Sequence, residues 1–255
     1  MAAVKSWSVV TGVGAAVIAL ASAVASADTT TIPNLTLHIG VGSSSYEYNA
    51  SQVGSSWANG NSTFGYSGTV SSSPFDGSGF IVSWGLLVNP DPFIVGNLVV
   101  TNTSSTTQTF FLDVALPIGA PMSSTLVGGS VTGTVTDLNG NGATVAAASP
   151  NDSIYRALTD VDGGFNGSLA GSLLTGSSAT AGQYQSKTIG PDSFGGPIPS
   201  MPYGAVNNNI AIRLAFTLTA GDSASFTSLF VVVPSPGALA VAAFGLVGFG
   251  RRRRA

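Results

Sequence analysis

The sequence has no cysteine and very little charge. Without cysteine among its 255 residues, neither disulfides nor thiol chemistry is available, so stability must come from packing and hydrogen bonding. The single histidine, His38, cannot supply the usual ligand set of a zinc site by itself. Charged residues make up only 7% of the chain, and four of its eight basic residues are consecutive, at positions 251–254.

The central part of the sequence, residues 28–233, is acidic. It holds three basic residues against eleven acidic ones, which gives a net charge of −8. Such a surface repels phosphate backbones, so we expect no nucleic acid partner. Its 206 residues are within the range of a single all-β domain and long enough to bury one core.

The first 27 residues have the pattern of a secretory signal peptide. Lys5 provides the short positive region, and Val9–Leu20 provides the apolar core. Ala25 and Ala27 provide the small residues of a cleavage site. Cleavage after Ala27 predicts an exported protein whose mature chain begins at Asp28.

In residues 28–233, referred to below as the body, apolar and polar residues alternate wherever a periodicity is clear. This alternation is typical of strands with one buried face. The alternation is clearest in residues 209–219 and 223–233, for which we predict a C-terminal hairpin. Second and third hairpins are predicted within residues 93–116 and 130–149, where polar and Asn-Gly turns separate β-rich runs. We expect Phe216, in the middle of the clearest strand, to be fully buried.

The remaining body shows weaker strand patterns and no helical period. The weaker strands are Leu35–Val41, Phe64–Val70, Phe80–Val88, Ile154–Thr159 and Gln183–Ile189. Many short strands separated by turns predict an all-β fold, an antiparallel β-sandwich of the Ig-like or jelly-roll-like kind over residues 28–233. Residues 190–209 are rich in proline and glycine and predict one long loop.

Few residues offer catalytic chemistry. His38 alternates with buried positions and is expected on the solvent face as a lone surface histidine. A Ser-His-Asp hydrolase would have to use it, and the sequence contains no G-x-S-x-G elbow. Glu47 is the only glutamate, and no spacing singles out the carboxylate pair of a glycosidase. We therefore predict no enzymatic activity, and a secreted hydrolase is the third-ranked alternative.

The segment DLNGNGA offers a calcium-binding alternative. Asp137, Asn139 and Asn141, followed by glycine, match the first half of a calcium loop, but the twelfth position is Ala148 instead of glutamate. Asp160 and Asp162 could add ligands from a neighbouring loop. The other interpretation is a metal-free Asn-Gly turn, which we favour. No cofactor is expected beyond this weak Ca²⁺ site.

The C-terminal tail has three parts in a fixed order. The motif Val233-Pro234-Ser235-Pro236 comes first, and an apolar run over Gly237–Gly250 follows it. The four arginines Arg251, Arg252, Arg253 and Arg254 come last and would stay on the cytoplasmic side of a membrane. Fourteen apolar residues span about 21 Å as a helix, which is short for a permanent anchor.

This arrangement resembles the PEP-CTERM sorting signal, which exosortases recognise in bacteria that make extracellular polysaccharide. The resemblance covers Val233 to Arg254 and combines a proline motif, a short membrane-targeting helix and an arginine cluster with an N-terminal signal. Ser235 stands where the family pattern has glutamate, so this is a V-P-x-P variant of the tail.

The resemblance implies a destination more than an activity. Residues 1–27 would be removed, residues 28–233 would form the domain, and the tail 234–255 would anchor the protein transiently in the inner membrane. An exosortase-like protease would then process it. We expect a non-enzymatic protein of the cell surface or extracellular matrix, with extracellular polysaccharide as a candidate partner. The first alternative is a calcium-assisted carbohydrate-binding or adhesion module.

Overall fold

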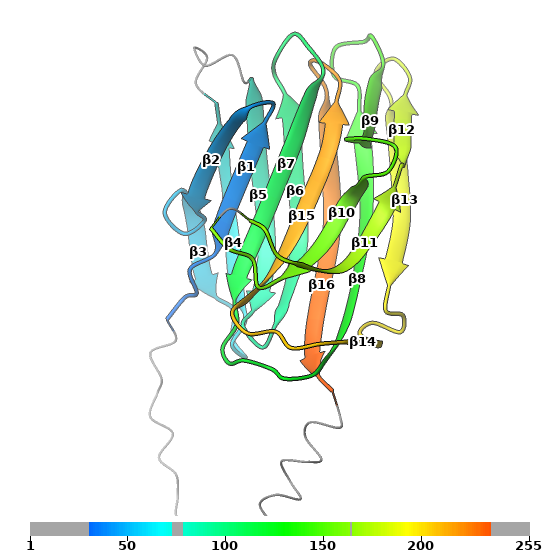
Figure 1. Cartoon of the computed structure of the whole chain (residues 1–255). Helices are drawn as coiled ribbons and strands as arrows, with labels where there is room; N and C mark the ends of the chain where they lie inside the picture. The colour runs from blue at the N-terminus through cyan, green and yellow to red at the C-terminus, as the bar shows by residue number, and fades with distance from the viewer. Residues whose placement is uncertain (1–30, 73–78, 164, 236–255) are drawn as a thin grey trace, which may run out of the picture. The chain divides into compact units, whose positions relative to one another are not determined.

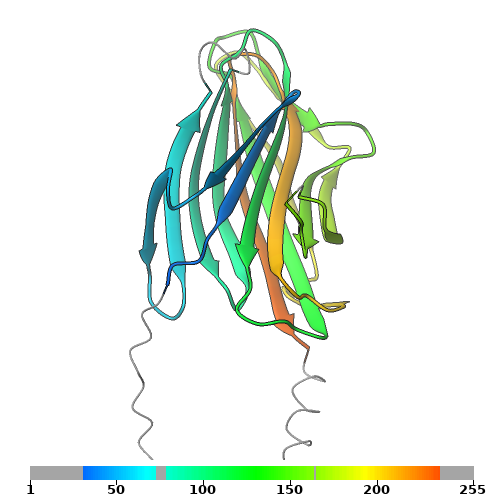
Figure 2. The same cartoon turned by 60° about the vertical axis from the view of Figure 1, so that its left-hand side comes forward.

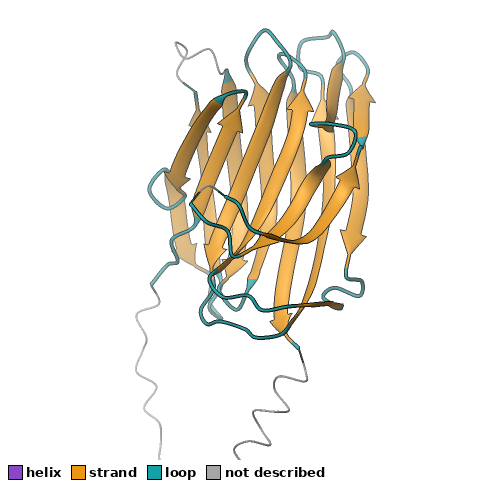
Figure 3. Ribbon diagram, viewed as in Figure 1, coloured by secondary structure: helices purple, strands orange, loops and turns teal. Residues whose placement is uncertain are grey.

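Every regular element that the structure describes is a β-strand. The computed structural model describes residues 31–72, 79–163 and 165–235, and Figure 3 shows these ranges as strands and loops. The expected signal peptide and the tail from Pro236 onward lie outside the described residues. Within the described ranges, none of the chain forms a helix with the length and apolar character needed to cross a bilayer.

The strands follow one another closely along the chain. They are β1 (Thr36–Val41), β2 (Ser44–Asn49), β3 (Gly54–Ala58), β4 (Phe64–Ser71), β5 (Phe80–Asn89), β6 (Phe93–Asn102), β7 (Gln108–Pro117), β8 (Thr125–Thr136), β9 (Ala143–Ala147), β10 (Ser153–Thr159), β11 (Ser168–Thr175), β12 (Ser178–Ala181), β13 (Ser186–Phe194), β14 (Met201–Tyr203), β15 (Asn209–Leu218) and β16 (Ser223–Pro234). All five weaker strand patterns of the sequence correspond to strands: β1, β4, β5, β10 and β13.

The strands form two antiparallel sheets that pack face to face. Sheet A has the order β11-β10-β15-β7-β1-β2, and the short strands β9 and β12 continue it beside β15. Sheet B has the order β13-β8-β16-β6-β5-β4-β3, with β14 beside β8. Figures 1 and 2 show one sheet lying behind the other. The predicted all-β sandwich is confirmed at this level.

The core lies between the sheets and is formed by the alternating residues of both. Phe216 of β15 is 0% exposed, as predicted. Its ring centroid lies 5.7 Å from that of Phe110 on β7 and 4.9 Å from that of Phe226 on β16. Because β16 belongs to the other sheet, this aromatic cluster contributes packing energy across the sandwich as well as along sheet A.

The three predicted hairpins are wrong in their pairing. β15 and β16 lie in different sheets, and so do β6 and β7, and β8 and β9. Each pair is joined by an arch that carries the chain from one sheet to the other. The alternation of residues cannot distinguish an arch from a hairpin, because in both cases every second residue is buried in the same core.

The three arches are hydrogen-bonded to one another at one end of the sandwich. The backbone N–H of Asn102 donates to the carbonyl of Asp222 at 2.9 Å, and the N–H of Gly221 donates back to Asn102 at 2.8 Å. The buried Asn102 side chain also donates to the carbonyl of Leu218 at 2.9 Å. The side-chain amide of Asn139, in the arch between β8 and β9, donates to the carbonyl of Ala220, in the arch between β15 and β16, at 2.9 Å. Polar side chains therefore fix the turns that the sequence assigned to hairpins.

The predicted long loop at residues 190–209 is only partly irregular. β13 continues to Phe194 and pairs with β8, and β14 pairs with the same strand further along. The prolines did not prevent pairing because these strands lie at the edge of sheet B, where an N–H can be dispensed with. The sequence also missed β2, β3, β11 and β12, whose residues are mostly exposed or only partly buried.

Candidate functional site

A single row of polar residues crosses the outer face of sheet A. The members lie directly opposite one another on six neighbouring strands: Glu47, His38, Asp113, Arg213, Arg156 and Ser172. The row contains every Asp, Glu, Lys, Arg and His residue found in the strands of sheet A. We take this row as the candidate site.

The centre of the row is a buried ion pair. Asp113 is 1% exposed, and its Oδ1 lies 2.5 Å from Nε of Arg213 while Oδ2 lies 3.2 Å from Nη2. Two parallel bonds of this kind give an arginine–carboxylate pair a fixed geometry. Because the carboxylate is shielded from water, the bonds to this partner offset the cost of burying it.

His38 joins the same cluster. Its Nδ1 lies 2.9 Å from Oδ2 of Asp113, and its Nε2 lies 2.6 Å from the hydroxyl of Ser45. The ring stacks on Phe165 with centroids 4.7 Å apart. The predicted outer-face position of His38 is correct, but the prediction of a lone surface histidine is wrong, because its side chain is only 21% exposed and has three partners.

Phe165 belongs to the segment that connects β10 to β11, and this connection covers part of sheet A. Its carbonyl accepts a 2.8 Å hydrogen bond from Nη2 of Arg213. Beneath it, a small apolar cluster on the outer face of sheet A joins Phe165 to Ala115, Leu158, Val161 and Ala211. At its start, the carboxylate of Asp160 accepts the backbone N–H groups of Asn207 and Asn208 at 2.8 and 2.7 Å. The connection is therefore fixed at both of these points.

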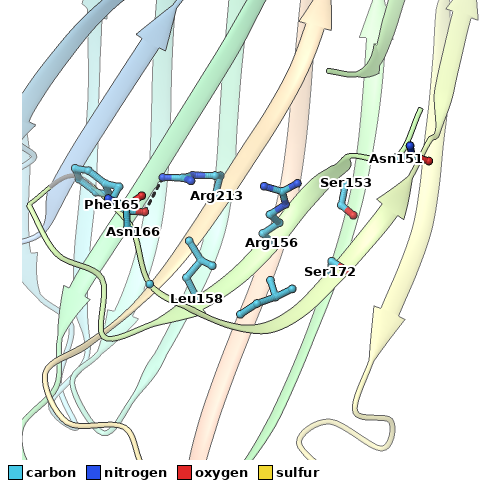
Figure 4. Close-up of a pocket in the computed structure, with 10 residues that line it drawn as sticks. Asn151, Ser153, Arg156, Leu158, Phe165, Asn166, Ser172 and Arg213 are labelled. Carbon is cyan, nitrogen blue, oxygen red and sulfur yellow. Dashed lines mark hydrogen bonds between the residues drawn. The ribbon is translucent and has the colours of Figure 1, made fainter. Parts of the chain in front are cut away.

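A pocket of about 370 Å³ opens beside this connection, over β15, β10 and β11. Figure 4 shows Arg213, Arg156 and Ser153 following one another along it, between Phe165 and Asn166 on one side and Asn151 on the other. Leu158 and Leu169 add apolar walls. Two guanidinium groups, several hydroxyl and amide groups and an apolar surface therefore face the same space.

The strands of sheet B are very different in character. Seven of them, β3, β4, β5, β6, β8, β14 and β16, contain no Asp, Glu, Lys, Arg or His residue. Neighbouring strands are linked by neutral side chains instead, as in the hydroxyl pair Thr69–Ser83 at 2.9 Å and the Asn97–Thr227 bond at 3.2 Å. The ionisable chemistry of the two sheets is thus concentrated in sheet A.

The predicted calcium loop forms the turn between β8 and β9. The buried carboxylate of Asp137 accepts the backbone N–H of Gly140 at 3.1 Å and that of Tyr184 at 2.6 Å. Burial alone would raise the pKa of Asp137, but the backbone N–H groups that it accepts outweigh this and lower the pKa. Gly140 and Gly142 have positive φ values of 83° and 88°, as Asn-Gly turns require.

These bonds give Asp137 a structural role in closing the turn. Asn139 is engaged as well, since its Oδ1 accepts the N–H of Asn141 at 3.1 Å. Among the described residues, no group of three or more His, Cys, Asp or Glu side chains lies close enough together to hold a metal ion. The residues proposed for calcium therefore lie on one turn, where the side-chain oxygens of Asp137 and Asn139 accept backbone N–H groups.

The proposed contribution of Asp160 and Asp162 to that loop is wrong. The backbone N–H of Asp160 bonds Asn209, the first residue of β15, whereas Asn139 bonds Ala220, just beyond the last residue of the same strand. Ten strand residues separate the two ends, roughly 30 Å. The acidic pair therefore lies at the opposite end of the sandwich.

Ser45, His38 and Asp113 have the connectivity of a Ser-His-Asp triad. Two features weaken it as a catalytic device. Asp113 is bound by Arg213 through both oxygens, which offsets the negative charge that would stabilise an imidazolium ion. Ser45 lies within the regular strand β2, and not at the tight strand-to-helix turn of a nucleophile elbow.

The first residues of the expected sorting motif lie inside the fold. Val233 and Pro234 are the last residues of β16 and lie opposite Leu126 and Thr125 of β8. The N–H of Ser235 then donates to the carbonyl of Ser124 at 3.0 Å. Pro236 and Arg251–Arg254 lie outside the described residues, as do Ala25 and Ala27 of the expected signal cleavage site.

No known family model matches the chain, and no curated protein shows significant sequence similarity to it. The function is therefore argued from the chemistry of the site and from the two ends of the sequence. Sequence reasoning identified His38 but missed Asp113, Arg213 and Ser45, because only the strand register brings together residues up to 100 positions apart.

Proposed function

We propose that this is an exported, non-enzymatic protein of the cell surface or extracellular matrix. It is secreted through its N-terminal signal, held transiently in the inner membrane by its tail and processed by an exosortase-like protease. The observation that carries this proposal is the order of motif, apolar run and arginines in residues 233–254. The end of β16 at Pro234 supports it, because the last strand that the structure describes ends where the tail begins.

The outer face of sheet A supports binding over catalysis. The carboxylate that a hydrolase would use to orient His38 is engaged by Arg213, and the candidate nucleophile Ser45 lies on a regular strand. The calcium-assisted module remains the first alternative, and the bonds of Asp137 to backbone N–H groups favour a metal-free turn instead. A pocket that contains two arginines needs no metal to recognise a ligand.

Intact-mass measurement on the protein from its native host tests this proposal. We expect a mature form that begins at Asp28 and has lost Arg251–Arg254. A cut after Ser235 would leave β16 and its bond to Ser124 complete, so the mature domain would keep its last strand. A mature form that still carries the four arginines would contradict exosortase processing and indicate an ordinary membrane anchor.

A further inference from the structure

The two arginines of the candidate site lie directly opposite each other. Arg156 on β10 faces Arg213 on β15 in the register of sheet A. Like charges in this position destabilise a sheet. Residues 28–233 contain only three basic residues, and two of them are placed side by side. Each guanidinium is paired with one aspartate, Asp152 or Asp113, and a ligand that carries negative charge would be attracted to both guanidinium groups at once.

Both guanidinium groups can donate further hydrogen bonds. The bonds to Asp113 and to the Phe165 carbonyl use Nε and Nη2 of Arg213. The ion pair with Asp152 uses Nη2 of Arg156. Neither set requires Nη1, and an arginine has five N–H donors in a planar fork. A planar carboxylate is the anion that this fork matches best.

The remainder of the pocket matches a hydroxylated ring. Ser172 lies opposite Arg156 on β11, and the amides of Asn151 and Asn166 stand at the two sides (Figure 4). Leu169 is 54% exposed and lies on the pocket wall. A sugar ring combines hydroxyl groups with an apolar face of C–H bonds, so this mixture of polar and apolar walls suits it. The volume, about 370 Å³, is within the range of small-ligand sites.

We propose that this pocket binds a uronate residue of an acidic polysaccharide. The carboxylate lies between Arg156 and Arg213, the ring hydroxyls bond Ser172 and the flanking asparagines, and the apolar face of the ring packs on Leu169. This inference deepens the proposed function, since it rests on a location where the protein meets extracellular polysaccharide. It assigns a ligand class to a site that requires neither calcium nor catalysis.

Calorimetric titration of the purified full chain tests the proposal with three probes. Glucuronate oligomers are expected to bind in a saturable manner with heat release. Glucose oligomers of the same length have the same rings without carboxylates, and they are expected to show no binding. Acetate supplies the carboxylate without the ring, and it should bind at least tenfold more weakly than the glucuronate oligomers.

Substitutions locate the binding within the structure. Arg156→Gln removes one guanidinium from a partly exposed position without exposing the buried Asp113, and it should weaken glucuronate binding about tenfold or more. Lys187→Gln is the matched control, because it removes the same charge from the exposed edge strand β13. It should leave binding unchanged. Ser172→Asp leaves Arg156 in place but puts a competing carboxylate opposite it and removes the Ser172 hydroxyl, so it should weaken binding at least as much as Arg156→Gln.

Four results would overturn the proposal. They are no binding of glucuronate oligomers at millimolar concentration, equal binding of glucose oligomers, acetate binding as tight as that of the oligomers, and equal weakening by Lys187→Gln and Arg156→Gln. The intact-mass result on the tail is independent of all four. A processed protein that binds no uronate would refute only the ligand, and an unprocessed one that binds it would refute only the sorting.

Discussion

Asp113 and Arg213 form a two-point ion pair across β7 and β15, and the carboxylate is 1% exposed on the outer side of the sheet instead of in the core. It is shielded by the connection that carries Phe165, whose carbonyl also bonds Arg213. The pair therefore links the sheet to the segment that covers it. Its value lies in positioning, since buried ion pairs contribute little net stability over apolar replacements.

Removing one partner of this ion pair should destabilise the protein much more than removing both partners. Arg213→Met leaves the buried carboxylate of Asp113 with only the His38 bond, and we expect a loss of about 3 kcal/mol in the free energy of unfolding. The double variant Asp113→Leu/Arg213→Met should lie within about 1 kcal/mol of the unchanged protein. Urea unfolding of the three proteins measures this. Equal losses in the single and double variants would show that the pair itself is the source of stability.

The aromatic cluster between the sheets predicts a sharp contrast along β15. Phe216→Ala should lower the free energy of unfolding by about 3–5 kcal/mol, because it removes a fully buried ring that packs against residues of both sheets. Thr217→Ala, on the opposite face of the strand, should cost less than about 1 kcal/mol. Chemical denaturation of both variants decides this. Similar losses at the two positions would be incompatible with the observed register.

We predict that Asp222, in the arch between β15 and β16, makes the stability of the domain depend on pH. Burial raises the pKa of Asp222, and the nearby charge of Asp137 raises it further. The pKa of Asp222 in the folded protein therefore exceeds the ordinary value of 3.8. The stabilising contribution of this group to the free energy of unfolding is fully present below pH 3.8 and is lost as the pH rises through the folded pKa. Asp222→Asn should consequently melt at a higher temperature than the unchanged protein at pH 7, and this gain should shrink at pH 3.

Asp137 provides the control of opposite sign. Because backbone N–H groups lower its pKa, its stabilisation is present above the ordinary value of 3.8 and is lost as the pH falls through the folded pKa. Asp137→Asn should therefore be less stable at pH 7, with a smaller deficit in strong acid. Melting curves at both pH values for the two variants test the pair. Parallel shifts in the same direction would contradict the assignment.

Calcium should leave the stability of the domain unchanged. The carboxylate of Asp137 and the amide of Asn139 already accept backbone N–H groups, so millimolar calcium should not shift the melting temperature relative to a chelator. Asp137→Ala should lower the melting temperature equally in both conditions, because it removes hydrogen bonds and no metal. A calcium-dependent rise that Asp137→Ala abolishes would restore the calcium-assisted module.

The serine beside His38 should not behave as a nucleophile. The oxygen of an activated serine attacks the phosphorus of a fluorophosphonate probe and displaces fluoride. We expect no such label at Ser45 by peptide mass spectrometry, since Arg213 engages the carboxylate behind His38. Labelling of a known serine hydrolase by the same probe in the same sample controls for reagent activity. Labelling of Ser45 that His38→Ala removes would place an active hydrolase on this face.

The sequence predicted the strands of this fold better than their partners. Alternation located β15 and β16 and placed Phe216 in the core, because burial of one face imposes a period of two on any strand. It could not decide between hairpin and arch, since the choice depends on which sheet accepts the second strand. That choice is made by contacts such as the Asn102 side chain bonding Leu218, 116 residues away.

The candidate site was less accessible to sequence reasoning than the fold. His38 attracted attention as the only histidine, but nothing local marks Asp113 or Arg213 as its neighbours. Their proximity follows from the register of β1, β7 and β15, which is set by the whole sheet. The signal that could have helped was the rarity of charge: in a chain this poor in charge, an aspartate and an arginine within otherwise apolar strands call for a partner.

The neutrality of β3, β4, β5, β6, β8 and β16 has a consequence for how the domain responds to ionic strength. Salt weakens interactions between exposed charges over distances of about 8 Å at physiological concentration, and these strands offer no charge to screen. Binding contacts made through the outer face of sheet B should therefore persist at high salt concentration. Contacts made at the arginines of sheet A should weaken under the same condition. A salt titration thus reports which of the two faces a partner touches.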